Sequence, residues 1–123
     1  MALVTAQTII DRARVVLKDA PADTSVRRWT DTELMRWLND GYKEMVSLRP
    51  NLYCNADETE YTTIPIPAIA DISIGDDLRI HSSHAHVLLL YVAGNALGKD
   101  AEEGDAALAK ANMDNFYAKM GAL

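Results

Sequence analysis

The chain has a single cysteine, Cys54, among 123 residues, which excludes an internal disulfide. One cysteine is typical of a reducing compartment, and the amino-terminal stretch MALVTAQTII lacks the basic flank and long apolar run of a signal peptide, so we expect no export. The longest apolar run, residues 87–93, is far too short to span a bilayer. The sequence therefore predicts neither a disulfide scaffold nor a membrane protein.

Positive charge is also scarce. The chain has 12 lysines and arginines against 18 aspartates and glutamates, for a net charge of -6. Such a chain repels phosphate backbones, so we expect no sequence-specific DNA binding, although DNA could slide past an acidic wall. With 49% hydrophobic and 24% charged residues, the composition is that of one ordinary globular domain over residues 1–123.

A first amphipathic helix is predicted from Thr5, because apolar residues recur at helical spacing until a proline-bearing connector at residues 20–25. The apolar positions of this helix are Ile9, Ile10, Ala13, Val16 and Leu17. Its remaining face is expected to carry Asp11, Arg12, Arg14 and Lys18.

The start of the second helix has the clearest signal in the chain. Thr30 and Glu33 have the spacing of a capping box, in which each side chain accepts a hydrogen bond from the other residue's backbone N–H. Trp29 and Leu34 flank this pair at the positions of a hydrophobic staple. The helix should stop before Pro50, which disfavours helical geometry in the preceding residue.

An extended arm is predicted at about residues 55–80, where isoleucines alternate with other residues. Pro65 and Pro67 cannot donate to a sheet ladder, so the segment is an edge strand or a free arm. Its apolar side chains are expected to bury against a neighbouring subunit. The predicted subunit interface comprises Tyr61, Ile64, Ile66, Ile72 and Ile74.

Two further helices complete the prediction. The third, from about residue 83 to 99, is so apolar that part of its cover is expected from another chain. The fourth starts at an Asp100 cap or after Gly104 and is closed by Gly121. The predicted fold class is thus mainly α: a small four-helix bundle with an extended arm or β-hairpin between the second and third long helices.

All three histidines lie in the stretch HSSHAHV, at His81, His84 and His86. No single backbone state gathers three imidazoles at this spacing, and no HExxH or paired-cysteine signature accompanies them. We therefore expect no metal and no cofactor, with Ser82 or Ser83 capping the following helix. A small metal-dependent hydrolase built on these histidines stays open as the enzyme alternative. The chain has no nucleophile elbow, phosphate-binding loop or dinucleotide fingerprint, so the prediction is that it is not an enzyme.

Two blocks of the sequence carry a resemblance. Residues 17–50, LKDAPADTSVRRWTDTELMRWLNDGYKEMVSLRP, resemble the opening of phage adaptor proteins of the head-to-tail connector group, with an RW-T/S-D-x-EL-x-x-LN pattern that ends in LRP. Residues 91–121, YVAGNALGKDAEEGDAALAKANMDNFYAKMG, resemble the end of the same proteins. The two blocks cover most of the chain apart from the arm, and the middle section is much shorter than in the longer members.

The resemblance implies a structural virion protein that forms a homo-oligomeric ring, usually twelve-fold, on the portal at the capsid vertex. Such a ring extends the DNA channel and offers a platform to a tail or nozzle protein, and it assembles in the host cytoplasm. The resemblance also implies that the carboxy-terminal helix contacts the portal, through Phe116, Tyr117, Met120 and Leu123. A helical binding module unrelated to virions is the remaining alternative.

Overall fold

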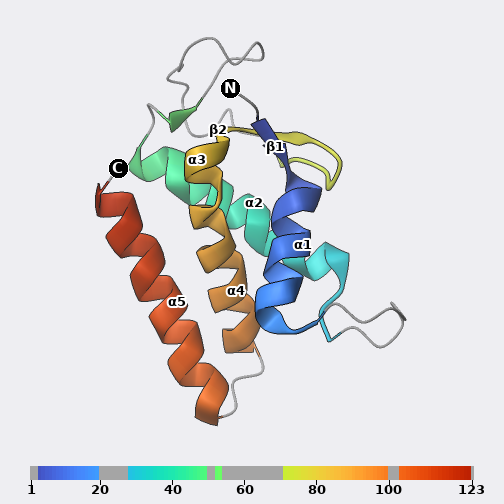
Figure 1. Ribbon diagram of the computed structural model, residues 1–123, viewed down its shortest axis with the longest axis vertical. Coiled ribbons are helices and arrows are strands. Elements are labelled where there is room, and N and C mark those ends of the chain that lie inside the picture. Colours follow the sequence, from blue (N-terminus) through green and yellow to red (C-terminus); the bar gives the residue numbers. More distant parts are fainter. Residues whose placement is uncertain (1–2, 20–27, 50–51, 54–70, 100–102, 123) are drawn as a thin grey trace.

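The computed structural model describes residues 3–19, 28–49, 52–53, 71–99 and 103–122. In this part of the chain, four long helices and one short helix form a bundle with a two-stranded antiparallel sheet at one end (Figure 1). The predicted small helical bundle is confirmed. The elements are β1 (Leu3–Thr5), α1 (Ala6–Leu17), α2 (Asp31–Leu48), β2 (Asp77–His81), α3 (Ser82–Ala85), α4 (Val87–Lys99) and α5 (Glu103–Ala122).

The sheet joins segments that are far apart in the sequence. β1 pairs with β2 in the register Leu3 to His81 and Thr5 to Asp77, with an irregularity between the two pairs. On the other edge of β2, Tyr53 forms an isolated antiparallel bridge with Ile80. β2 therefore pairs both with the amino-terminal strand β1 and with Tyr53, which follows α2 in the sequence.

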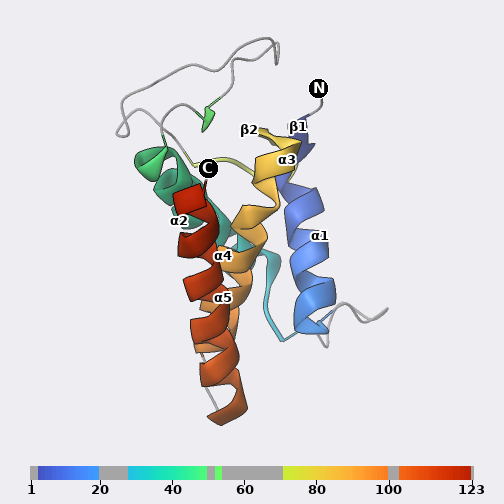
Figure 2. The ribbon, with the colours of Figure 1, turned by 60° about the vertical axis from the view of Figure 1, so that its left-hand side comes forward.

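α4 occupies the centre of the bundle and packs against α5, α2 and α1. α1 and α5 lie on opposite sides of it in both views (Figures 1 and 2). These helices of the same chain bury most of its surface, and Leu89, Leu90 and Tyr91 are left half-buried. The expectation that another chain supplies part of its cover stays a prediction. Its buried residues are Val87, Leu88, Val92, Ala93, Gly94, Ala96 and Leu97.

α1 departs from its predicted faces at two positions. Arg14 is only 2% exposed, so its assignment to the polar face is wrong; it lies one turn after Ile10, on the buried side of the helix. Val16, expected among the apolar core positions, is 52% exposed. The buried face of α1 consists of Ala6, Ile9, Ile10, Ala13 and Arg14.

α2 begins and ends as predicted. The backbone N–H of Glu33 donates to Thr30 Oγ1 at 3.1 Å, and the N–H of Thr30 donates to Glu33 Oε1 at 3.3 Å, which completes the capping box. Trp29 is buried directly before the cap, and Arg49 is the C-cap residue. By contrast, α5 continues through Gly121 to Ala122, so the prediction that Gly121 closes the last helix is wrong.

Candidate interaction surfaces

The three histidines lie where β2 turns into α3 and α4. His81 is the N-cap of α3. Its Nδ1 accepts a hydrogen bond from the backbone N–H of Ser83 at 3.0 Å and is also hydrogen-bonded to the Ser83 hydroxyl. The cap is therefore the histidine and not Ser82 or Ser83, as the sequence had suggested. An Nδ1 that accepts these bonds has no lone pair for a metal ion.

His84 lies on the same side as His81, with the ring centroids 6.2 Å apart in an edge-to-face arrangement. Burial lowers the pKa of His84 below its ordinary value, and the nearby charges of His81 and His86 lower that pKa further. Among the described residues, no three histidine, cysteine, aspartate or glutamate side chains come together as metal ligands. The structure thus gives the hydrolase alternative no assembled site in the part that it describes.

The predicted arm is described only at its carboxyl end. Ile72 and Ile74 are half-buried and pack against the core of their own chain, and their contact with a neighbouring subunit stays a prediction. Asn39 of α2 holds this segment: its Nδ2 donates to the Ile72 carbonyl at 3.2 Å, and its Oδ1 accepts from the Ile72 N–H at 2.9 Å. Tyr61, Ile64 and Ile66 lie outside the described residues.

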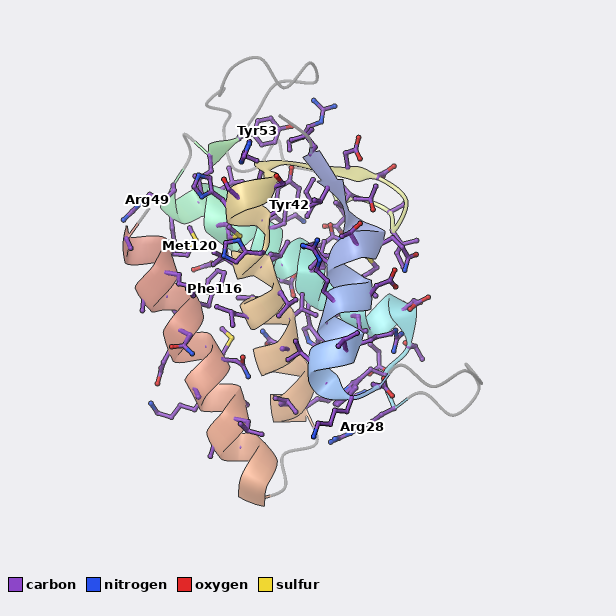
Figure 3. All side chains as sticks on the ribbon, viewed as in Figure 1. Arg28, Tyr42, Arg49, Tyr53, Phe116 and Met120 are labelled. Carbon is purple, nitrogen blue, oxygen red and sulfur yellow. The ribbon has the colours of Figure 1, made fainter. Side chains whose placement is uncertain are left out.

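The predicted portal-contact residues of α5 divide into two groups. Phe116 is fully buried and Met120 is 2% exposed, and both point from α5 toward α4 (Figure 3). The Phe116 ring stacks edge to face on Tyr91 of α4, with the centroids 5.1 Å apart. Both are therefore core residues of the single chain, and their contact with a portal stays a prediction. Tyr117 is 48% exposed, and Leu123 lies outside the described residues.

Two open grooves mark the described part of the surface, and several of the polar groups that line them are already bonded. One, between α2, α4 and α5, has Lys99 and Lys110 at its rim, but Lys99 pairs with Glu33 and Lys110 with Asp114. The other runs between α2 and residues 72–74 and includes Asn39, which holds Ile72. Thr32 and Arg36 of α2 also line this second groove.

The exposed large apolar side chains provide a stronger signal of function. In the described part of the chain, five stand out at the surface: two on α1, one on α2 and two on α5, where Leu108 lies nine residues before Tyr117 and so on the opposite face of the helix. They are Val15 (70% exposed), Val16 (52%), Leu48 (39%), Leu108 (55%) and Tyr117 (48%).

The first of these surfaces, called the α1 face, consists of Arg12, Val15, Val16 and Lys18. Arg12 lies one helical turn before both valines, and Lys18 is the C-cap residue of the helix. All four side chains are exposed. The apolar pair is thus accompanied by two cations.

The second surface, called the α2–α5 face, consists of Asp40, Glu44, Leu48 and Tyr117. Asp40, Glu44 and Leu48 follow one another at four-residue spacing along one side of α2. Burial raises the pKa of Tyr117, and the adjacent Glu44 carboxylate, which is hydrogen-bonded to it, raises that pKa further. This contact brings α5 to the same surface, which therefore carries an apolar pair beside two carboxylates.

The sequence reasoning missed the buried network around Arg14. Its Nη1 donates to Asp19 Oδ2 and to the Trp29 carbonyl, each at 2.9 Å, and its Nη2 donates to Asp31 Oδ1 at 2.6 Å. Asp19 in turn accepts from the backbone N–H of Trp29 at 3.1 Å. The available signal was the four-residue spacing of Ile10 and Arg14, which places the arginine on the apolar side of its helix.

None of the helices in the described ranges is long and apolar enough to cross a membrane. No family model matches the chain, and neither a curated protein nor a solved structure matches it.

Proposed function

We propose that this chain is a structural assembly protein of the head-to-tail adaptor kind. Copies of it would join in a ring beneath the portal of a tailed phage, extend the DNA channel and carry the tail attachment platform. The observation that supports this proposal best is the pair of exposed apolar surfaces, the α1 face and the α2–α5 face, on helices that lie on opposite sides of α4. A subunit in a ring needs two different contact surfaces, because each copy meets two neighbours.

The charge of the chain is compatible with this role. With a net charge of -6, a ring of such subunits would hold DNA weakly, and weak attraction lets DNA slide through a channel. The resemblance of residues 17–50 and 91–121 to adaptor proteins gives the proposal its specific form. In the structure these blocks contain α2 and α5, which supply the α2–α5 face.

The proposal is tested by measuring the mass of the purified chain, alone and mixed with a portal protein from the same source, and by imaging the same samples with negative stain. We expect annular particles, either of the chain itself or of the chain seated on portal rings. A chain that stays at its monomer mass of 13.6 kDa in both samples contradicts the proposal. A small complex of defined mass that never closes into a ring favours the helical binding module instead.

A further inference from the structure

We infer that the α1 face of one copy binds the α2–α5 face of the next copy, so that identical chains associate head to tail. This inference rests on the proposed function, since it assigns the two surfaces by which neighbours in a ring meet. The partner it names is a second copy of this chain, and the contact is between unlike surfaces.

The argument begins with the positions of the two surfaces. α1 and α5 lie on opposite sides of α4, and α2 runs behind α4 from the α1 side of the bundle to the α5 side (Figures 1 and 2). Leu48 and Glu44 belong to the carboxyl half of α2, the half that reaches α5. One copy can therefore present both surfaces at once without the two contacts overlapping.

The charges of the two surfaces are complementary. The α1 face has Arg12 and Lys18 beside its valines, and within the described residues neither cation is hydrogen-bonded or ion-paired. Of the neighbouring carboxylates, Asp11 accepts a hydrogen bond from Gln7 Nε2 at 2.7 Å, and Asp19 is buried and paired with Arg14. The α2–α5 face has Asp40 and Glu44 beside Leu48 and Tyr117. Complementary charge orients two surfaces and disfavours the pairing of like with like.

Like-with-like pairing is the alternative, because a two-fold dimer would place the same surface of both copies together. Two α1 faces would bring four cations together around four valines, and two α2–α5 faces would bring four carboxylates together around their apolar side chains. Either arrangement places like charges next to one another. In the unlike pairing, the cations of the α1 face meet the carboxylates of the α2–α5 face. A contact between unlike surfaces repeats until it closes into a ring or extends as a filament.

The test uses two variants, Val15→Asp and Leu48→Asp. Each places on one surface a carboxylate that the contact would have to bury. Thr32→Asp is the matched control, because Thr32 is exposed and lies at the amino end of α2, far along the helix from Leu48. Masses are measured under the condition, alone or with portal, in which the unsubstituted chain assembles. Circular dichroism checks that each variant keeps its helices.

The association constant of each blocked variant alone should fall at least tenfold, while Thr32→Asp should assemble like the unsubstituted chain. An equal mixture of the two variants should form a complex of two chains and grow no further, since only one intact α1 face and one intact α2–α5 face can meet. Two-fold pairing gives no mixed complex of this kind. If the mixture yields only monomers, or if both variants assemble fully, the inference is overturned while ring formation by the unsubstituted chain still upholds the proposed function.

A charge exchange supplies an independent check. Arg12→Glu and Glu44→Lys should each weaken assembly. The chain that carries both substitutions should regain it, because the glutamate at position 12 of one copy then pairs with the lysine at position 44 of the next. Failure of the double variant to exceed either single variant would show that these two residues do not meet. An unsubstituted chain that never associates, alone or with portal, overturns both the inference and the proposed function.

Discussion

Arg14 and Asp19 form an ion pair inside the protein, with Nη1 and Oδ2 separated by 2.9 Å and only 2% and 7% of the two side chains exposed. The pair lies at the carboxyl end of α1, and Asp19 also accepts hydrogen bonds from the backbone N–H groups of Arg28 and Trp29. A single carboxylate thus ties the end of one helix to the segment that begins the next.

Replacement of Asp19 by alanine should lower the free energy of unfolding by about 3 kcal/mol, because it leaves the buried Arg14 with less compensation. The loss is expected at the lower end of the range for broken buried pairs, since Asp31 still accepts from Arg14 at 2.6 Å. Urea denaturation followed by circular dichroism measures it. Asp11→Ala on the exposed side of α1 is the control, and equal losses in the two variants would contradict the structural role of Asp19.

Asn39→Ala should destabilise the chain by about 1–3 kcal/mol, because both backbone groups of Ile72 lose their partner. Asn112→Ala is a matched control: Asn112 donates to the carbonyl of Leu108 within its own helix at 2.9 Å and, among the described residues, to no other element. Both substitutions gain the same helix propensity, so the difference between their unfolding free energies reports the contact with Ile72. Faster hydrogen exchange at the Ile72 amide should accompany Asn39→Ala alone.

Gly41→Ala and Gly98→Ala form a second matched pair, both inside helices. A Cβ at Gly41 would lie 2.6 Å from Leu88 Cδ1 and 2.7 Å from the Tyr91 ring, whereas a Cβ at Gly98 would lie 3.7 Å from the nearest atom, Ala109 Cβ. We expect Gly41→Ala to lower the midpoint of thermal unfolding by overpacking, at a cost of about 1–3 kcal/mol. Gly98→Ala should raise that midpoint, because alanine is favoured over glycine in a helix by about 1 kcal/mol. The same sign of change in both variants would contradict this packing.

Acidification should weaken the fold through His84. Its pKa is lowered in the folded chain from the ordinary 6.5, chiefly by burial, so the unfolded chain binds the proton first as the pH falls. The free energy of unfolding therefore declines as the pH drops below about 6.5 and levels off below the folded pKa. Denaturation between pH 7.5 and 5 measures the decline, which His84→Gln should reduce.

An NMR titration of the His84 ring provides a direct check on the same group. We expect a midpoint below 6.5 in the folded chain, and a partial return toward 6.5 in His86→Gln, since one of the charges that lower the pKa is removed while burial remains. A midpoint at or above 6.5 in the unsubstituted chain would refute this account.

Local chemistry explains which parts of the fold were predictable. Thr30 and Glu33 are three residues apart, so the cap that starts α2 is encoded within one turn of sequence. Leu78 and Ile80 alternate with exposed or half-exposed neighbours, and both are buried in β2 as the alternation indicates. Short-range patterns of this kind need no knowledge of the rest of the chain.

The missed features depend on partners far along the chain. β1 has only three residues, and its partner strand follows α2, so no local periodicity distinguishes it. Arg14 was assigned to the polar side by its charge, although its buried position is satisfied by Asp19 and Asp31. The α1 face was missed for a related reason: Val16 fits the apolar spacing of α1, and only the three-dimensional packing leaves it exposed. Of the α2–α5 face, the sequence indicated Tyr117 alone as a contact residue.

The pairing of β1 with β2 also bears on how the molecule folds. The helices form from contacts between near neighbours in the sequence, which form quickly. β1 and β2 flank α1 and α2 in the sequence, so the two strands can pair only when these helices have brought them together. We expect the sheet to close late in folding, together with the other contacts between distant segments, such as those of α1 with α4. A newly synthesised chain would carry a bare strand until then, and in that interval a chaperone or a sister chain has its best opportunity to bind.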